Sequence, residues 1–344
     1  MIPVSCPVPP TAGDRIELAH GGGGRMTQWL IREIFHPAFG TSPDDFVHDG
    51  AVLDVGIGRF AFSTDSYVVR PIFFPGGDIG SLAINGTVND LAMCGAEPLY
   101  LGVGFVLEEG FALAELRRIV ASMREAADAA GIRIVTGDTK VVERGKGDGV
   151  YLNTSGVGRV LSTQPISPLR VQQGDAVIVS GDIGRHGIAV MAAREGFEFE
   201  TPITSDCAPL AAEVRALIDA GIDLHCLRDL TRGGLATGLI EIAQAARSCI
   251  CLSEAAIPVA EPVRGACEIL GFDPLYVANE GRFAAVVPRN DATRTLDILR
   301  SFNPSAAMIG AVGDGAANGG VVLRTLGGTR PLDLPSGEQL PRIC

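Results

Sequence analysis

Lysine is almost absent from this 344-residue chain. Its 28 basic residues include only two lysines, Lys140 and Lys146. Arginine keeps its proton at any usable pH, whereas a desolvated lysine can release one, so a lysine in a motif is a candidate base or nucleophile. Lys146 lies in the polar, glycine-rich run 143–149, which is typical of a solvated turn. Lys140 follows Asp138 at the end of an apolar run and is therefore the better candidate.

An excess of positive charge and long apolar runs are missing as well. The formal net charge of −12 argues against a broad basic surface that would attract nucleic acid. No uncharged apolar run is long enough to span a bilayer, and residues 1–15 lack the basic and apolar regions of a secretory signal. We therefore expect a cytoplasmic protein that binds neither membranes nor nucleic acid.

Standard cysteine and phosphate-binding motifs are also lacking. The eight cysteines form no CxxC pair, which favours free thiols over disulfides, and the five histidines show no zinc-ligand spacing relative to them. The P-loop pattern GxxxxGK[ST] does not occur. Two glycine runs, "AHGGGGRM" and "TRGGLATG", each precede a predicted helix, whose N-terminal backbone N–H groups could bind phosphate.

Strand-like and helix-like segments are mixed along the whole chain. Apolar spacing predicts a hairpin over 51–69, a small-residue helix over 79–96, an amphipathic helix over 111–131 and a strand over 275–288. Polar residues and prolines near 162–174 indicate a domain boundary. We therefore expect two α+β domains, 14–165 and 166–326, with an N-terminal extension, 1–13, and a flexible tail, 327–344, that carries Cys344.

Acidic and amide residues recur at predicted strand ends and helix starts. Asn85 and Asn89 are one helical turn apart and share part of a face with Asp90. Hard oxygen ligands spread over several elements suit Mg²⁺ bound together with the phosphates of a nucleotide. A single aspartate in such a place is more often a cap or turn residue. The recurring aspartates are Asp49, Asp65, Asp90, Asp138 and Asp229.

Several of these segments together resemble one family. The runs "FSTDSYVV", "NGTVNDLAMCGAEP", "VTGDTKVV", "LRDLTRGGLA" and "VANEGRF", with the terminal "PRIC", resemble the HypE family of hydrogenase maturation factors. That family shares a superfamily with aminoimidazole ribonucleotide synthetase, selenophosphate synthetase and thiamine-monophosphate kinase. The aspartate motifs are common to the superfamily, whereas "PRIC" is specific to the family. The resemblance implies two α+β domains as in aminoimidazole ribonucleotide synthetase, and a homodimer that joins its N-terminal sheets.

The resemblance also implies a reaction on the last residue. A HypF-like carbamoyltransferase would load a carbamoyl group on Cys344, and ATP would drive dehydration of this thiocarboxamide to a thiocyanate. The cyano group would pass to an iron carrier resembling the HypC–HypD complex and become a cyanide ligand of a [NiFe] hydrogenase. Because amide oxygen is a poor leaving group, phosphorylation by ATP with Mg²⁺ would activate it.

The roles of individual residues are carried over from the same resemblance. Lys140 and Glu280 would take protons from the amide nitrogen of the group on Cys344 as the nitrile forms. The Mg²⁺ ligands would be Asp49, Asp65, Asp90, Asp138 and Asp229. The ATP-binding residues would be Asp65, Asn85, Asn89, Asp90, Asp138, Thr139 and Asp229.

Three alternatives are weighed against this interpretation. A selenophosphate synthetase needs a reactive cysteine and a lysine in its N-terminal glycine-rich segment, but Cys6 precedes "PVPP" and no lysine occurs before Lys140. A catalytically silent adaptor that docks its tail on a partner has no need of the aspartate set. Membrane attachment by prenylation needs a cysteine four residues from the end, whereas Cys344 is the last residue.

Overall fold

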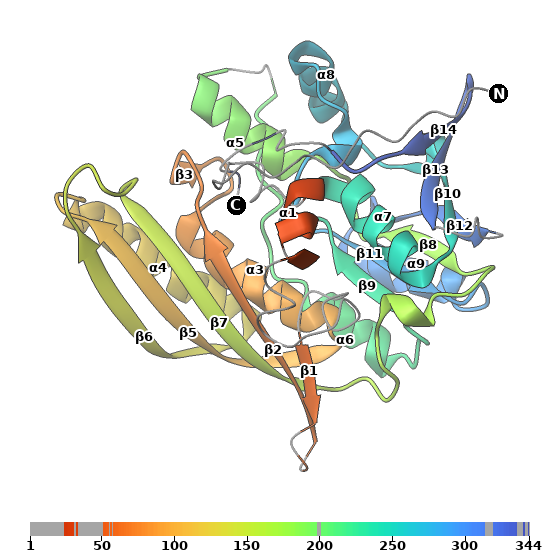
Figure 1. The fold of residues 1–344 in the computed structure, drawn as a ribbon, viewed down its shortest axis with the longest axis horizontal. Coiled ribbons are helices and arrows are strands. Elements are labelled where there is room, and N and C mark those ends of the chain that lie inside the picture. Colours follow the sequence, from red (N-terminus) through yellow and green to blue (C-terminus); the bar gives the residue numbers. More distant parts are fainter. Residues whose placement is uncertain are drawn as a thin grey trace.

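The computed structural model describes residues 24–30, 32–33, 51–54, 56, 58–197, 201–313, 319–335, 340 and 343. A short helix, α1 (Arg25–Leu30), precedes two sheets of different size. Figure 1 shows the first sheet on one side of the molecule, the second on the other, and helix α3 (Ile79–Met93) between them. No helix in the described part of the chain is long and apolar enough to cross a bilayer.

The first sheet has five strands in the order β1-β2-β7-β5-β6. Strands β1 and β2 form the predicted antiparallel hairpin. Strands β5 and β6 are parallel and are connected through α4 (Leu113–Ala130), which packs with α3 on one face of the sheet (Figure 1). The bounds are β1 (Ala51–Asp54), β2 (Arg59–Tyr67), β5 (Ala96–Glu108), β6 (Arg133–Val142) and β7 (Val150–Val160). A small ribbon joins β3 (Phe73–Phe74) and β4 (Gly77–Asp78).

Local signals explain where the two helices of this domain begin and end. Asp78 caps α3 by accepting the backbone N–H groups of Gly80 and Ser81 at 2.8 and 3.0 Å. Helix α4 ends at Gly131, whose left-handed backbone (φ 69°) favours glycine. The helices predicted over 79–96 and 111–131 are therefore confirmed.

The second sheet has seven strands in the order β14-β13-β10-β12-β8-β11-β9. These strands are β8 (Ala176–Val179), β9 (Cys226–Asp229), β10 (Cys249–Ser253), β11 (Phe283–Val287), β12 (Ala307–Gly313), β13 (Gly320–Thr325) and β14 (Gly328–Leu332). The helices of this domain are α5 (Arg185–Glu195), α6 (Ala211–Asp219), α7 (Gly234–Ala246), α8 (Glu261–Leu270) and α9 (Ala292–Phe302). Between β7 and β8, residues 161–175 contain only a short 3₁₀ turn, and the boundary at residue 165 stays a prediction.

Two expectations about secondary structure are wrong. Within the strand predicted over 275–288, only Phe283–Val287 is extended in the sheet, and Pro274–Tyr276 form a 3₁₀ turn. The tail expected to be flexible from 327 begins with β14, which pairs antiparallel with β13. Glycine and proline in this segment are not typical of a strand, yet β14 buries Leu332 in the hydrophobic core of the second domain and takes its backbone partners from β13.

The two domains share a hydrophobic core. Leu82 and Ile84 on α3 belong to the same cluster of buried side chains as Ile188 on α5 and Val277 beyond the 3₁₀ turn. Burial of apolar area between the domains stabilises their arrangement. The buried face of α3 therefore carries its polar residues to the junction of the two domains.

Candidate functional site

Four acidic side chains from both domains gather near this junction, and we call them the acidic centre: Asp65, Asp90, Asp229 and Glu280. Asp65 is on β2 and Asp90 on α3, while Asp229 ends β9 and Glu280 lies just before β11. Burial, followed by the carboxylates of Asp229 and Asp206, raises the pKa of Glu280 well above its ordinary value. Burial, followed by the carboxylates of Asp65, Asp90 and Glu280, likewise raises the pKa of Tyr67, so the structure brings together three of the predicted aspartates and the predicted glutamate.

Asp65 lies close to the start of helix α7. Burial raises the pKa of Asp65, and the guanidinium of Arg232, 3.8 Å away, acts in the opposite direction. Gly233 and Gly234 follow with positive φ values of 77° and 60°, a conformation that favours glycine, and α7 begins there. The helix predicted after "TRGGLATG" is confirmed, and its N-terminal end lies beside the acidic centre. Such an end binds anions through free backbone N–H groups and the helix dipole.

Asn85 and Glu280 each present a buried oxygen without a hydrogen-bond partner. The Asn85 amide nitrogen donates to the Cys207 sulfur at 3.4 Å, while its Oδ1 has no partner, and Glu280 Oε1 has none either. Burial raises the pKa of the Cys207 thiol, and the Glu280 carboxylate adds to this effect, so the three groups are neighbours. Unpaired buried acceptors cost free energy, and at a functional site they indicate a missing donor.

Asn89 has a different environment, one turn along the same helix. Its Nδ2 donates to the carbonyl oxygens of Ala208 at 3.1 Å and Glu280 at 3.3 Å. Its Oδ1 accepts the Leu210 N–H at 2.8 Å. Both ends of the amide are thus used within the protein, and Asn89 joins α3 to the second domain.

Three further predicted residues of the first domain lie on the edge strand β6. Asp138 and Lys140 are exposed, and Lys140 Nζ lies 2.6 Å from Asp138 Oδ2, which lowers the pKa of this carboxyl. Thr139 is exposed between them. Strands β7 and β5 separate β2 from β6, so at about 4.8 Å per strand Asp138 is roughly 14 Å from Asp65. One chain therefore does not bring the β6 residues to the acidic centre.

Two predicted positions fall outside the described residues: Asp49, expected to bind metal, and Cys344, expected to carry the substrate. The preceding residue, Ile343, is described and buried. Among the residues that the structure describes, no three histidine, cysteine, aspartate or glutamate side chains are close enough to hold a metal ion by themselves. The six cysteines described are free.

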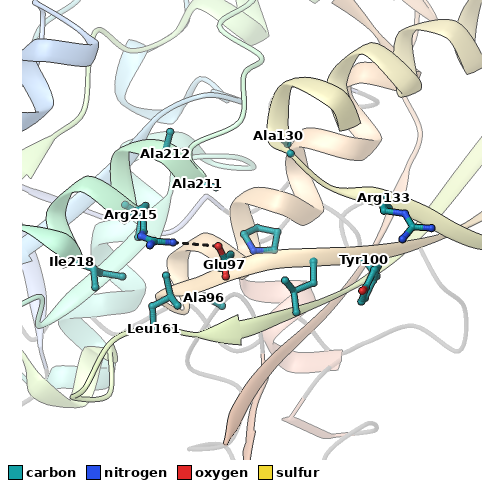
Figure 2. Close-up of a pocket in the computed structure, with 14 residues that line it drawn as sticks. Ala96, Glu97, Tyr100, Ala130, Arg133, Leu161, Ala211, Ala212, Arg215 and Ile218 are labelled. Carbon is teal, nitrogen blue, oxygen red and sulfur yellow. Dashed lines mark hydrogen bonds and ion pairs between the residues drawn. The ribbon is translucent and has the colours of Figure 1, made fainter.

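A separate cavity of about 430 Å³ lies between β5, α4 and α6, and Figure 2 shows the side chains that line it. Arg215 Nη1 lies 3.2 Å from Glu97 Oε1 across the domain junction. None of the predicted site residues lines this cavity. The acidic centre, and not the cavity, is therefore the candidate site.

The sequence did not reveal the segment Ser205–Cys207. Cys207 contacts Asn85, and the Asp206 carboxylate accepts the backbone N–H groups of His186 and Gly281, each at 3.1 Å. A lone aspartate and a lone cysteine in a loop give no periodic or motif signal. Only packing against α3 and α5 brings them to the site.

Both domains match described families. Residues 47–160 match the AIR synthase related protein, N-terminal domain, and residues 172–322 match the AIR synthase related protein, C-terminal domain. The two matches show a protein of the AIR synthase class, and the predicted two-domain α+β fold is confirmed.

Individual relatives define the family more narrowly. The chain is 49% identical to the carbamoyl dehydratase HypE of Azotobacter vinelandii, over 96% of this chain and 97% of that protein. A crystal structure of HypE in complex with ATP is 46% identical with a TM-score of 0.81, over 96% and 100% of the two chains. A crystal structure of a HypE–HypF complex is 45% identical with a TM-score of 0.84, over 89% and 99%. The chain belongs to the HypE family.

Proposed function

We propose that this carbamoyl dehydratase uses ATP to dehydrate a carbamoyl group on its own Cys344, and that the thiocyanate formed supplies cyanide ligands to a [NiFe] hydrogenase. One observation carries the proposal: Asn85 Oδ1 and Glu280 Oε1 are buried acceptors without a hydrogen-bond partner in the described chain, and both residues act on the same Cys207 thiol. The substrate is a primary amide, whose nitrogen is a double hydrogen-bond donor. A carbamoyl NH₂ placed between these oxygens would satisfy both.

ATP would bind where the two domains meet. The N-terminal end of α7 and the guanidinium of Arg232 are suited to phosphate groups. The carboxylates of the acidic centre fit Mg²⁺, a hard cation that one or two carboxylates hold together with nucleotide phosphates. When bound, Mg²⁺ would neutralise charge on the phosphates. One or two of Asp65, Asp90 and Asp229 would hold such an ion together with the phosphates.

The chemistry needs an oxygen to leave and two protons to be accepted. The carbamoyl oxygen would take the γ-phosphoryl group of ATP and leave as phosphate, while the two N–H protons are removed as the C≡N bond forms. Glu280 is suited to one proton because a carboxylate with a raised pKa is a stronger base than an ordinary one. Lys140 would accept the other.

Lys140 would reach the site from a second copy of the chain. The first sheet exposes apolar side chains that a monomer leaves in water, and an exposed apolar edge is typical of an interface. These side chains are Val52, Phe62, Tyr100, Val106, Ile134, Val135 and Val141. A homodimer that covers them would place β6 of one chain, with Asp138, Thr139 and Lys140, against the acidic centre of the other.

A HypF-like carbamoyltransferase would load Cys344, in line with the solved HypE–HypF complex. An iron carrier resembling the HypC–HypD complex would accept the cyano group. We place these steps in the cytoplasm.

Intact-mass measurement after mixing with the carbamoyltransferase, carbamoyl phosphate and ATP tests the function. The chain should gain the mass of one carbamoyl group and then lose that of one water. Cys344→Ala should bind ATP normally and show neither change. If this variant still forms thiocyanate, the carrier is another residue.

A further inference from the structure

The first turn of helix α5 contacts the C-terminal residues Leu340 and Ile343 through His186 and Gly187, and we call this contact surface the seat. Leu340 and Ile343 are both buried and belong to the core cluster shared by the two domains. A Cβ atom on Gly187 would lie 3.1 Å from Leu340 Cδ1 and 2.5 Å from Val277 Cγ1. A side chain at this position would therefore crowd Leu340, and glycine leaves the space that Leu340 occupies.

His186, next to this glycine, makes a hydrogen bond to the tail. Its Nε2 lies 2.9 Å from the carbonyl oxygen of Ile343, and a carbonyl oxygen can only accept, so Nε2 carries the hydrogen. Burial lowers the pKa of His186, which favours the neutral ring, and in a neutral ring with the hydrogen on Nε2 the Nδ1 atom is an acceptor. Ser205 Oγ, 2.8 Å away, donates to Nδ1 and accepts the Cys207 N–H at 3.0 Å.

The same seat is coupled to the loop that carries Glu280. One oxygen of Asp206 accepts the backbone N–H of His186, and the other accepts that of Gly281, each at 3.1 Å. A Cβ on Gly281 would collide with the Asp206 carbonyl oxygen, so the two loops are in direct contact. The Asp206 carboxylate therefore links His186, which is hydrogen-bonded to the tail, with Gly281, the residue after Glu280.

We propose that His186 is a positioning residue that seats the C-terminal tail, through its hydrogen bond to the Ile343 carbonyl, so that Cys344 meets Glu280. The inference rests on the proposed function. The Ile343 carbonyl belongs to the planar peptide group that continues to residue 344, whose Cα is about 3.8 Å from that of Ile343. Fixing this oxygen therefore orients the backbone from which the Cys344 side chain extends. His186 itself touches neither the sulfur nor the carbamoyl group in this role.

Two variants of the full-length protein separate hydrogen bonding from packing. His186→Leu removes the donor, whereas His186→Gln retains a side-chain N–H. Two rates are measured: alkylation of Cys344 by iodoacetamide, followed by mass spectrometry of the C-terminal peptide, and first-order dehydration of the carbamoylated chain. In His186→Leu we expect alkylation to rise and dehydration to fall by about tenfold each, the effect of one lost hydrogen bond. His186→Gln should restore most of both rates, and the ATP Kd should not change.

A second pair of variants tests the seat while His186 stays in place. Leu340→Ser should also speed alkylation of Cys344, whereas Leu326→Ser, at a fully exposed leucine, should not. Wild-type alkylation in both His186→Leu and Leu340→Ser overturns the inference. Equal damage by His186→Gln and His186→Leu overturns the hydrogen bond as its cause. If the loaded wild-type chain never loses water, the proposed function fails, while the alkylation rates still decide whether His186 seats the tail.

Discussion

Replacing Asn89 by alanine should destabilise the protein without weakening nucleotide binding. This asparagine was expected to bind ATP, yet its buried amide makes three hydrogen bonds to the backbone of the second domain. Losing them, with the Leu210 N–H left without its side-chain acceptor, should cost about 2–4 kcal/mol. With an unfolding entropy of about 2.1 cal/mol/K per residue, this corresponds to a fall in Tm of about 3–6 °C for a chain of this size.

Asn85→Ala is the matched control, one turn along the same helix. Asn85→Ala removes one hydrogen bond, from the amide nitrogen to the Cys207 sulfur, which is a weak acceptor. The change also removes the unpaired buried oxygen Oδ1. We expect it to cost less than about 1 kcal/mol, so its Tm should stay near the wild-type value. Its dehydration rate should fall, because Asn85 Oδ1 is a proposed acceptor for the carbamoyl nitrogen.

Thermal unfolding and ATP titration of the two variants decide between these roles. We expect a low Tm with normal ATP affinity for Asn89→Ala, and a normal Tm with slow dehydration for Asn85→Ala. A wild-type Tm combined with weakened ATP binding in Asn89→Ala would refute the structural role assigned to it.

Three further variants test the site and the dimer. Glu280→Gln should abolish dehydration. The raised pKa of Glu280 makes the folded protein bind more protons than the unfolded one above about pH 4.5, so wild-type stability falls as the pH rises there. The Tm of Glu280→Gln minus that of the wild type should therefore be larger at pH 8 than at pH 5. An equal Tm difference at the two pH values would contradict this. Lys140→Arg should bind ATP but dehydrate slowly, since the charge stays and the basicity is lost; near-normal turnover excludes Lys140 as a base. Val141→Asp, at an exposed position of β6, should shift the proposed homodimer to monomer in light scattering and lower activity; a dimer that survives this change contradicts the proposed interface.

Local sequence signals were enough to predict helix α4 and the start of helix α7. Apolar spacing and the glycine at 131 marked α4 to within a few residues, and the glycines of "TRGGLATG" marked the start of α7. These features depend on neighbours in the chain, so a single sequence reveals them. The strand β14 was missed because its pairing with β13 depends on an edge that forms only in the folded sheet.

Side-chain roles were harder to predict than elements. Asn85 and Asn89 have the same chemistry and share a helix face, yet one keeps an unpaired oxygen at the site and the other bonds the backbone across the domain junction. Likewise, Asp65 and Asp138 both stand in glycine-flanked or apolar strands, but two intervening strands keep them apart in one chain. Neither difference can be detected from residue spacing or composition.

The sequence by itself determined the class of chemistry: hard oxygen ligands, a rare lysine, glycine-rich helix starts and a family-specific terminal cysteine are properties of residue type and order. The tertiary structure alone decided which groups meet. It buried Glu280 among carboxylates and so raised its pKa, and it separated the β6 residues from the acidic centre. It also placed His186 within hydrogen-bond distance of the Ile343 carbonyl oxygen. The physical reason is that burial, pairing and distance arise from contacts between segments far apart in the chain, which no local pattern encodes.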